Sequence, residues 1–249
     1  MHRTIYFLIL VLILGCGSSN GQNPYLNSGY GYVDVEGGEI WYGILGEGVE
    51  TPYLYLHGGP GGKSSGGVYL NDISDKRPVI LMDQLGGGLS TYHEDTTLLK
   101  VDKFVAQVKA ITDELDLNEF YLTGHSWGTA LALEYYLQYP EGVKGIVFNS
   151  PYFSTSIWVA DCDTLITQLP DSIQEDIAIA EKMNAFETKA YQHAMVAFYE
   201  NFMIRSTEVN WQSIPGYELF SSSFNRKDIS GNNFIYNYMW GPSEFSPTG

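Results

Sequence analysis

Ser126 is the residue of this chain whose setting best fits covalent chemistry. It lies in the middle of the sequence Gly124-His125-Ser126-Trp127-Gly128, between an apolar run and a segment with helical spacing. A serine hydroxyl is a weak nucleophile, and enzymes that use one expose it on a sharp strand-to-helix turn, beside a helix N-terminus that favours negative charge. We therefore predict that Ser126 is a nucleophile at such an elbow. The alternative is a structural turn that happens to carry a serine.

A glycine-rich loop at residues 57–62, with the sequence HGGPGG, is suited to binding an oxyanion. Because glycine lets the backbone approach a substrate closely, N–H groups of such a loop can donate to an oxygen that becomes negative during acyl transfer. We expect the two donors to be the N–H groups of Gly59 and of Trp127, the residue after the nucleophile. A phosphate-binding loop is the alternative, but the chain has no GxxxxGK[ST] pattern.

Two further residues are expected to support these loops. His57 is the first residue of the first loop. In an α/β fold with a nucleophile elbow, however, the catalytic histidine comes after both the nucleophile and the acid in the sequence. We therefore predict that His57 fixes its loop through hydrogen bonds. Asp83 opens a second loop, DQLGGGLS at residues 83–90. A carboxylate there can accept several backbone N–H bonds, so we expect Asp83 to hold the loop, with direct catalysis as the alternative.

The elements around these loops predict a sheet that brings them to one edge. Short apolar runs are typical of parallel strands buried on both faces, and such runs alternate here with segments of helical spacing. This order predicts an α/β fold with a doubly wound, mostly parallel sheet and functional loops at the carboxyl ends of its strands. The expected elements are a hairpin at 29–35 and 39–45, strands at 53–56, 79–82, 120–122 and 145–149, and helices at 102–115 and 129–139.

The character of the chain changes after residue 150. Three successive helices are predicted, and a capping box of Ser172 and Glu175 would begin the second. No further parallel strand is expected, so we interpret this part as a helical cap insertion and expect the last core strands to be missing. The predicted helices are 157–169, 172–186 and 188–205, and the predicted divisions are an export signal with a tether at 1–22, the N-terminal part of the core at 23–150 and the cap at 151–249.

Length and charge narrow the class of protein. A chain of 249 residues with 44% hydrophobic content can bury one sizeable core. The net charge of −16 argues against nucleic acid or an anionic membrane surface as a partner. A cationic substrate group would be attracted, although acidity also keeps an exported protein soluble.

The first residues have the pattern of an export signal. A charged start precedes a short apolar run, and residues 12–16, LILGC, resemble a bacterial lipobox. We expect Cys16 to be lipidated and residues 17–22 to form a flexible tether. The protein would then be an exported lipoprotein, anchored to a membrane at its periplasmic or extracellular face. A signal that is cleaved elsewhere and an uncleaved anchor are the alternatives.

Four motifs in this order resemble the proline iminopeptidase family of α/β-hydrolases, which includes the tricorn-interacting aminopeptidases. They are HGGPGG at residue 57, DQLGGGLS at 83, GHSWGT at 124 and GPSEF at 241, and the resemblance covers roughly residues 30–249. It implies an enzyme that removes an N-terminal residue, often proline, from peptides without a metal or cofactor. It also implies that Ser126 is the nucleophile, that Gly59 and Trp127 form the oxyanion hole, and that Glu244 binds the free α-amine of the substrate.

The chain departs from the family pattern after Ser126. The only later histidine is His193, inside a predicted cap helix, where a packing or surface role is expected. We therefore expect that the catalytic Asp and His are absent, that the chain ends within or just after the cap, and that these 249 residues alone are nearly inactive. Residues 145–149 would then form an exposed apolar sheet edge, which favours aggregation.

Two rival functions remain at this stage. One is an esterase or amidase that uses the same elbow on small substrates. The other is a protein without catalysis, either a short paralogue that binds peptides or a non-functional remnant. A requirement for an unblocked substrate amine would separate the aminopeptidase from the first rival, since a carboxylate that binds the amine rejects acetylated peptides.

Overall fold

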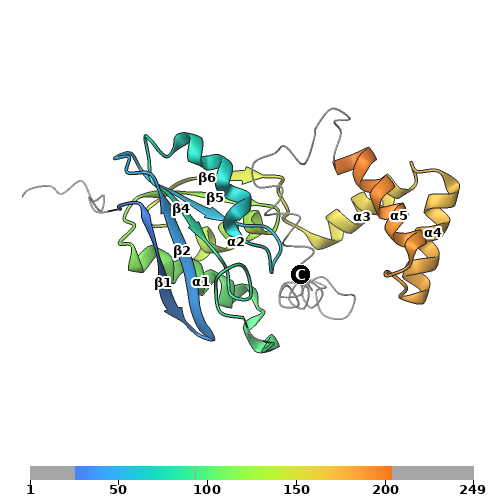
Figure 1. The fold of residues 1–249 in the computed structure, drawn as a ribbon, viewed down its shortest axis with the longest axis horizontal. Coiled ribbons are helices and arrows are strands. Elements are labelled where there is room, and N and C mark those ends of the chain that lie inside the picture. The colour runs from blue at the N-terminus through green and yellow to red at the C-terminus, as the bar shows by residue number, and fades with distance from the viewer. Residues whose placement is uncertain (1–25, 93, 204–249) are drawn as a thin grey trace, which may run out of the picture.

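A mixed six-stranded sheet forms the centre of the protein (Figure 1). The computed structural model describes residues 26–92 and 94–203. The strand order is β1-β2-β4-β3-β5-β6, in which β1, β2 and β4 are antiparallel neighbours and β4, β3, β5 and β6 run parallel. The predicted α/β fold class is confirmed. The strands are β1 Gly29–Val35, β2 Gly38–Leu45, β3 Tyr53–Leu56, β4 Val79–Met82, β5 Phe120–His125 and β6 Val143–Asn149.

The parallel strands bring the predicted loops to one edge of the sheet. Strands β3, β4 and β5 end at Leu56, Met82 and His125, so the loops that begin at His57 and Asp83 and the turn at Ser126 leave the sheet on the same side. Buried apolar side chains at nearly every position of β3 and β4 hold these strands in place.

Helices cover the two faces of the sheet differently. On one face α1, Val101–Glu114, and α2, Trp127–Gln138, pack on the main core. The other face carries a smaller cluster around Tyr55, against which part of η1, the 3-10 helix Ser64–Ile73, packs. The sequence does not predict η1. Its sequence SSGGVYLNDI has no helical period of apolar residues, which explains the omission.

Within residues 151–203, the described part of the predicted cap, three α-helices lie beside the sheet at the right of Figure 1. Their bounds are α3 Thr155–Ile166, α4 Asp171–Met183 and α5 Lys189–Phe198, and a π-helical turn, Tyr199–Met203, follows α5. The predicted capping box on α4 is wrong. The N-cap is Pro170, which makes no side-chain cap bond, and its carbonyl accepts from Ile173 and Gln174, so Ser172 already lies inside the first turn.

Strand β6 lies at one edge of the described sheet, as the sequence predicted for residues 145–149. Val147 and Phe148 are 43% and 40% exposed there. No helix within residues 26–92 and 94–203 has the length and apolarity needed to cross a membrane. The predicted lipidation site Cys16 and the predicted amine-binding Glu244 lie outside the described residues.

Candidate active site

Ser126 lies at the apex of a strained turn between β5 and α2. Its backbone has φ 51° and ψ −120°, a conformation that costs a non-glycine residue roughly 1–3 kcal/mol and persists only where neighbours impose it. Two neighbours do so. The Ser126 N–H donates to the Asn149 carbonyl at 3.0 Å, and the Ser126 carbonyl accepts from the Thr129 hydroxyl at 2.6 Å. The turn therefore presents Ser126 at the N-terminus of α2, as a nucleophile elbow requires.

Glycines allow this turn because the chain segments around it approach closely. A Cβ atom on Gly128 would lie 2.1 Å from the Leu56 carbonyl oxygen, and one on Gly124 would lie 2.3 Å from the Gly128 carbonyl oxygen. Both distances are shorter than any real contact. The two flanking glycines of the motif thus let α2 pack directly on β3 and β5.

The glycine loop that starts at His57 lies against the elbow. A Cβ atom on Gly58 would lie 3.2 Å from the Ser126 Cβ atom and 3.2 Å from the His125 carbonyl oxygen. The next residue, Gly59, has φ 123°, which residues with side chains rarely adopt. The segments that carry the Gly59 and Trp127 N–H groups are therefore neighbours. The role of these two groups as oxyanion donors stays a prediction.

His57 is a buried neutral side chain with both ring nitrogens in hydrogen bonds. Its Nε2 accepts from the Gln84 N–H at 3.0 Å, so the ring proton is on Nδ1, which donates to the Gly58 carbonyl at 2.7 Å. Burial lowers the pKa of His57, and the neighbouring Asp83 carboxylate and the Gly58 carbonyl oppose that shift. These contacts hold the loop and leave no free nitrogen to act as a base.

Asp83 is buried and accepts backbone hydrogen bonds from two segments. Its Oδ1 accepts from the Ser64 N–H at 2.6 Å, and its Oδ2 accepts from the Leu89 N–H at 2.9 Å. A Cβ atom on Gly88 would collide with this carboxylate at 1.9 Å. The contacts are those expected of a loop-supporting residue.

Gln84 joins the two loops and the elbow, and sequence analysis did not single it out. It is fully buried. Its Nε2 donates to the His57 carbonyl at 3.1 Å, and its Oε1 accepts from the indole N–H of Trp127 at 3.0 Å. The only signal in the sequence is an uncharged polar residue placed directly after a buried strand, in a loop made mostly of glycine.

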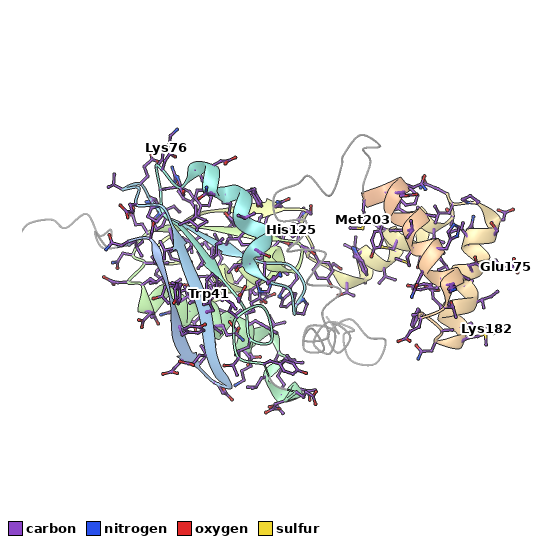
Figure 2. All side chains as sticks on the ribbon, in the orientation of Figure 1. Trp41, Lys76, His125, Glu175, Lys182 and Met203 are labelled. Carbon is purple, nitrogen blue, oxygen red and sulfur yellow. The ribbon has the colours of Figure 1, made fainter. Side chains whose placement is uncertain are left out.

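No hydrogen bond joins Ser126 to either of the two other described histidines. His125, labelled in Figure 2, lies at the end of β5. A Cβ atom on Gly58 would lie 3.3 Å from the Cδ2 atom of His125. Burial lowers the pKa of His125 more than its bond to Asn149 raises it. His193 lies on the exposed side of α5, as predicted. Within the described residues, no hydrogen bond joins a histidine to the Ser126 hydroxyl, and no cluster of His, Cys, Asp or Glu could hold a metal ion.

Comparisons with known proteins identify the family of this chain. Residues 51–236 match the model of the alpha/beta hydrolase fold family. A proline iminopeptidase of Heyndrickxia coagulans is 38% identical over 223 residues, which cover 88% of this chain and 73% of that protein. A proline iminopeptidase of Lactobacillus delbrueckii subsp. lactis is 32% identical over 88% of this chain and 72% of its own length. The chain belongs to the proline iminopeptidase family of α/β-hydrolases.

A solved structure of the family supports the same assignment. The proline iminopeptidase of Mycobacterium smegmatis superposes with a TM-score of 0.72 at 25% identity, covering 89% of this chain and 74% of its own. The resemblance that the four sequence motifs indicated is thereby confirmed at the level of family and fold.

Proposed function

We propose that this protein is a serine aminopeptidase that releases N-terminal residues, with proline as the preferred one, from peptides. The observation that carries the proposal is the contact between the strained Ser126 turn and the glycine loop at Gly58. The names of the similar proteins supply the substrate class, since both curated relatives are proline iminopeptidases. The net charge of −16 suits a substrate with a free ammonium group.

In the proposed reaction the Ser126 Oγ attacks the carbonyl carbon of the first peptide bond. The Oγ–C bond forms, the hydroxyl proton passes through a base to the leaving amine, and the C–N bond breaks to leave an acyl-enzyme that water hydrolyses. The N–H groups of Gly59 and Trp127 would stabilise the oxyanion in both steps. We assign the role of base to none of the described histidines, because both nitrogens of His57 are bonded and, within the described residues, no hydrogen bond joins His125 or His193 to Ser126.

The direct test is release of p-nitroaniline from proline p-nitroanilide by the protein and by Ser126→Ala. Because low turnover is expected of this chain, labelling by a fluorophosphonate probe, mapped by mass spectrometry, gives a second measurement. We expect Ser126→Ala to remove both signals, with Ser156→Ala, an exposed serine on α3, as the matched control. Turnover or labelling that persists in Ser126→Ala refutes the nucleophile assignment.

Substrate blocking tests the aminopeptidase assignment separately. Acetylation removes the positive charge of the substrate amine, so we expect acetylproline p-nitroanilide to react at least about tenfold more slowly than the free substrate. Equal rates for the two substrates would favour the esterase or amidase alternative on the same elbow.

A further inference from the structure

The side-chain amide of Gln84 connects the two segments that carry the proposed oxyanion donors. Its Nε2 donates to the carbonyl of His57, two residues before Gly59, and its Oε1 accepts from the indole of Trp127. The Gln84 backbone N–H adds a third bond, to the His57 ring. One residue on the second loop therefore bonds to both the glycine loop and the first residue of α2.

This connection is rigid because both of its ends are fixed. An amide group is planar, and Gln84 is fully buried, so few other rotamers are open to it. At the far end, the indole of Trp127 is 2% exposed and packs edge to face against Phe104, with ring centroids 5.7 Å apart. A shift of the glycine loop away from α2 would break one of the two amide bonds and leave a buried polar group without a partner.

We propose that Gln84 is a positioning residue for the oxyanion hole, which holds the Gly59 and Trp127 N–H groups at the separation that a tetrahedral intermediate needs. The inference rests on the proposed function and deepens it. Gln84 touches no reacting atom, and it acts through the two segments it joins. Small errors of donor placement are costly in catalysis, because a hydrogen bond to the oxyanion must form without reorganisation.

The amide is specifically suited to this task. One of its atoms must donate to a carbonyl and the other must accept from an indole N–H, and no other neutral side chain of this length does both. Glutamate has the same shape, but as a carboxylate it can only accept. It would bond to Trp127 and repel the carbonyl oxygen of His57 unless it were protonated.

The first test compares Gln84→Leu with Gln107→Leu. Gln107, on α1, is also buried and holds the same loop through the Leu85 N–H at 2.9 Å, but no bond joins it to His57 or Trp127. The substrate is the p-nitrophenyl ester of proline, whose leaving group needs no protonation, so that oxyanion stabilisation dominates the rate. We expect Gln84→Leu to lower kcat by about 10- to 100-fold and to leave KM within about twofold of the wild-type value, since the lost interaction acts in the transition state. Gln107→Leu should lose stability while its kcat stays within about twofold of the wild type.

The second test uses the pH profile of Gln84→Glu. The ratio of its kcat to that of the wild type should rise as pH falls, because a protonated carboxyl can donate to the His57 carbonyl as the amide does. A flat ratio overturns the inference. The kcat of the double variant Gln84→Leu with Trp127→Phe should lie within about twofold of the kcat of Gln84→Leu alone, because both changes break the same connection.

Failure of the proposed function can be told apart from failure of this inference. If the wild type hydrolyses the ester and Gln84→Leu matches it, the function stands and the inference fails. If the wild type neither hydrolyses the ester nor is labelled at Ser126, its rate does not test the inference, and hydrogen exchange decides it. Amides of residues 57–59, Gly61, Gly62 and Trp127 should then exchange faster in Gln84→Leu than in Gln107→Leu, and equal exchange in the two variants overturns it.

Discussion

At the carboxyl edge of the sheet, buried polar side chains connect loops that lie far apart in the sequence, whereas the cap helices meet through a small apolar cluster. Asp83, Gln84 and His57 bond three segments around Ser126. In the cap, α4 packs on α5 through a cluster that also includes Leu169 of the preceding loop, whereas α3 has no buried residue. The residues of the two helices in this cluster are Ile173, Ile177, Ala194 and Phe198. The difference teaches that a site for chemistry needs fixed distances, which directional hydrogen bonds supply, whereas a cap needs only to stay folded.

The largest effect on stability is expected where the backbone of α2 lies closest to the backbone of β3. Gly128→Ala places a methyl group 2.1 Å from the Leu56 carbonyl oxygen, and neither α2 nor β3 can move without disturbing the core. We expect a loss of about 3 kcal/mol or more in the free energy of unfolding, measured by urea denaturation. Gly29→Ala is the control, because nothing lies within 4 Å of its added Cβ atom. Equal stability of the two variants would contradict the close approach of α2 to β3.

The next effect separates the core from the cap. Leu131 is fully buried in α2 and Ile177 is 4% exposed in α4. We expect Leu131→Ala to lower global stability by about 3 kcal/mol and to raise hydrogen exchange throughout the sheet. Ile177→Ala removes a similar volume but should raise exchange only within residues 155–203. If Ile177→Ala raises hydrogen exchange in the sheet as well, the core and the cap unfold as one unit.

A smaller effect concerns the pH dependence of the polar region. Burial lowers the pKa of His57 in the folded state below its ordinary value of 6.5. As pH falls through about 6.5, the unfolded chain therefore binds a proton at His57 while the folded state does not. The contribution of His57 to the free energy of unfolding is complete above about pH 6.5 and is lost as pH falls toward the folded pKa. Urea denaturation at about pH 7.5 and about pH 5.5 measures this loss.

The control for that prediction is a change of a histidine in the other region. His57→Gln should reduce the difference in stability between the two pH values. His193→Gln, on the exposed side of α5, should leave it as in the wild type. A wild-type protein that gains stability on acidification over this range would reverse the sign of the argument.

The smallest effect is expected at the surface. The ion pair between Lys144 and Glu119 at 3.1 Å joins side chains that are 45% and 47% exposed. Such pairs are screened by water and salt, so Lys144→Ala should change stability by less than about 1 kcal/mol. Thermal unfolding at low and high salt checks this, and a large loss would show that the edge strand β6 depends on the pair.

The sequence predicted those elements best whose signal is local. Strands 53–56 and 79–82 were predicted with their observed bounds, because both are continuous apolar runs between turn residues. The start of α4 was misplaced, since Pro170 and Ser172 both suit a helix start and the sequence alone does not rank them. The 3-10 helix η1 was missed for lack of any period.

At the candidate site, residue types were predictable and connections were not. The elbow at Ser126 and the glycine loop each have a local pattern with a known mechanical reason. The role of Gln84, by contrast, depends on hydrogen bonds to His57 and Trp127, which lie 27 and 43 residues away in the sequence. No local pattern encodes such contacts. The tautomer of His57 likewise follows only from the direction of the Gln84 N–H bond.

The buried hydroxyl of Thr129 has a mechanical consequence for the whole molecule. Thr129 lies on α2, one helical turn after Ser126. Its hydroxyl oxygen accepts from the N–H of Tyr152 at 2.8 Å, and Tyr152 lies just before the first cap helix. The start of the connecting segment is thus held against α2, one helical turn from Ser126, so a change in the placement of α3 to α5 that leaves this bond intact must begin beyond Tyr152.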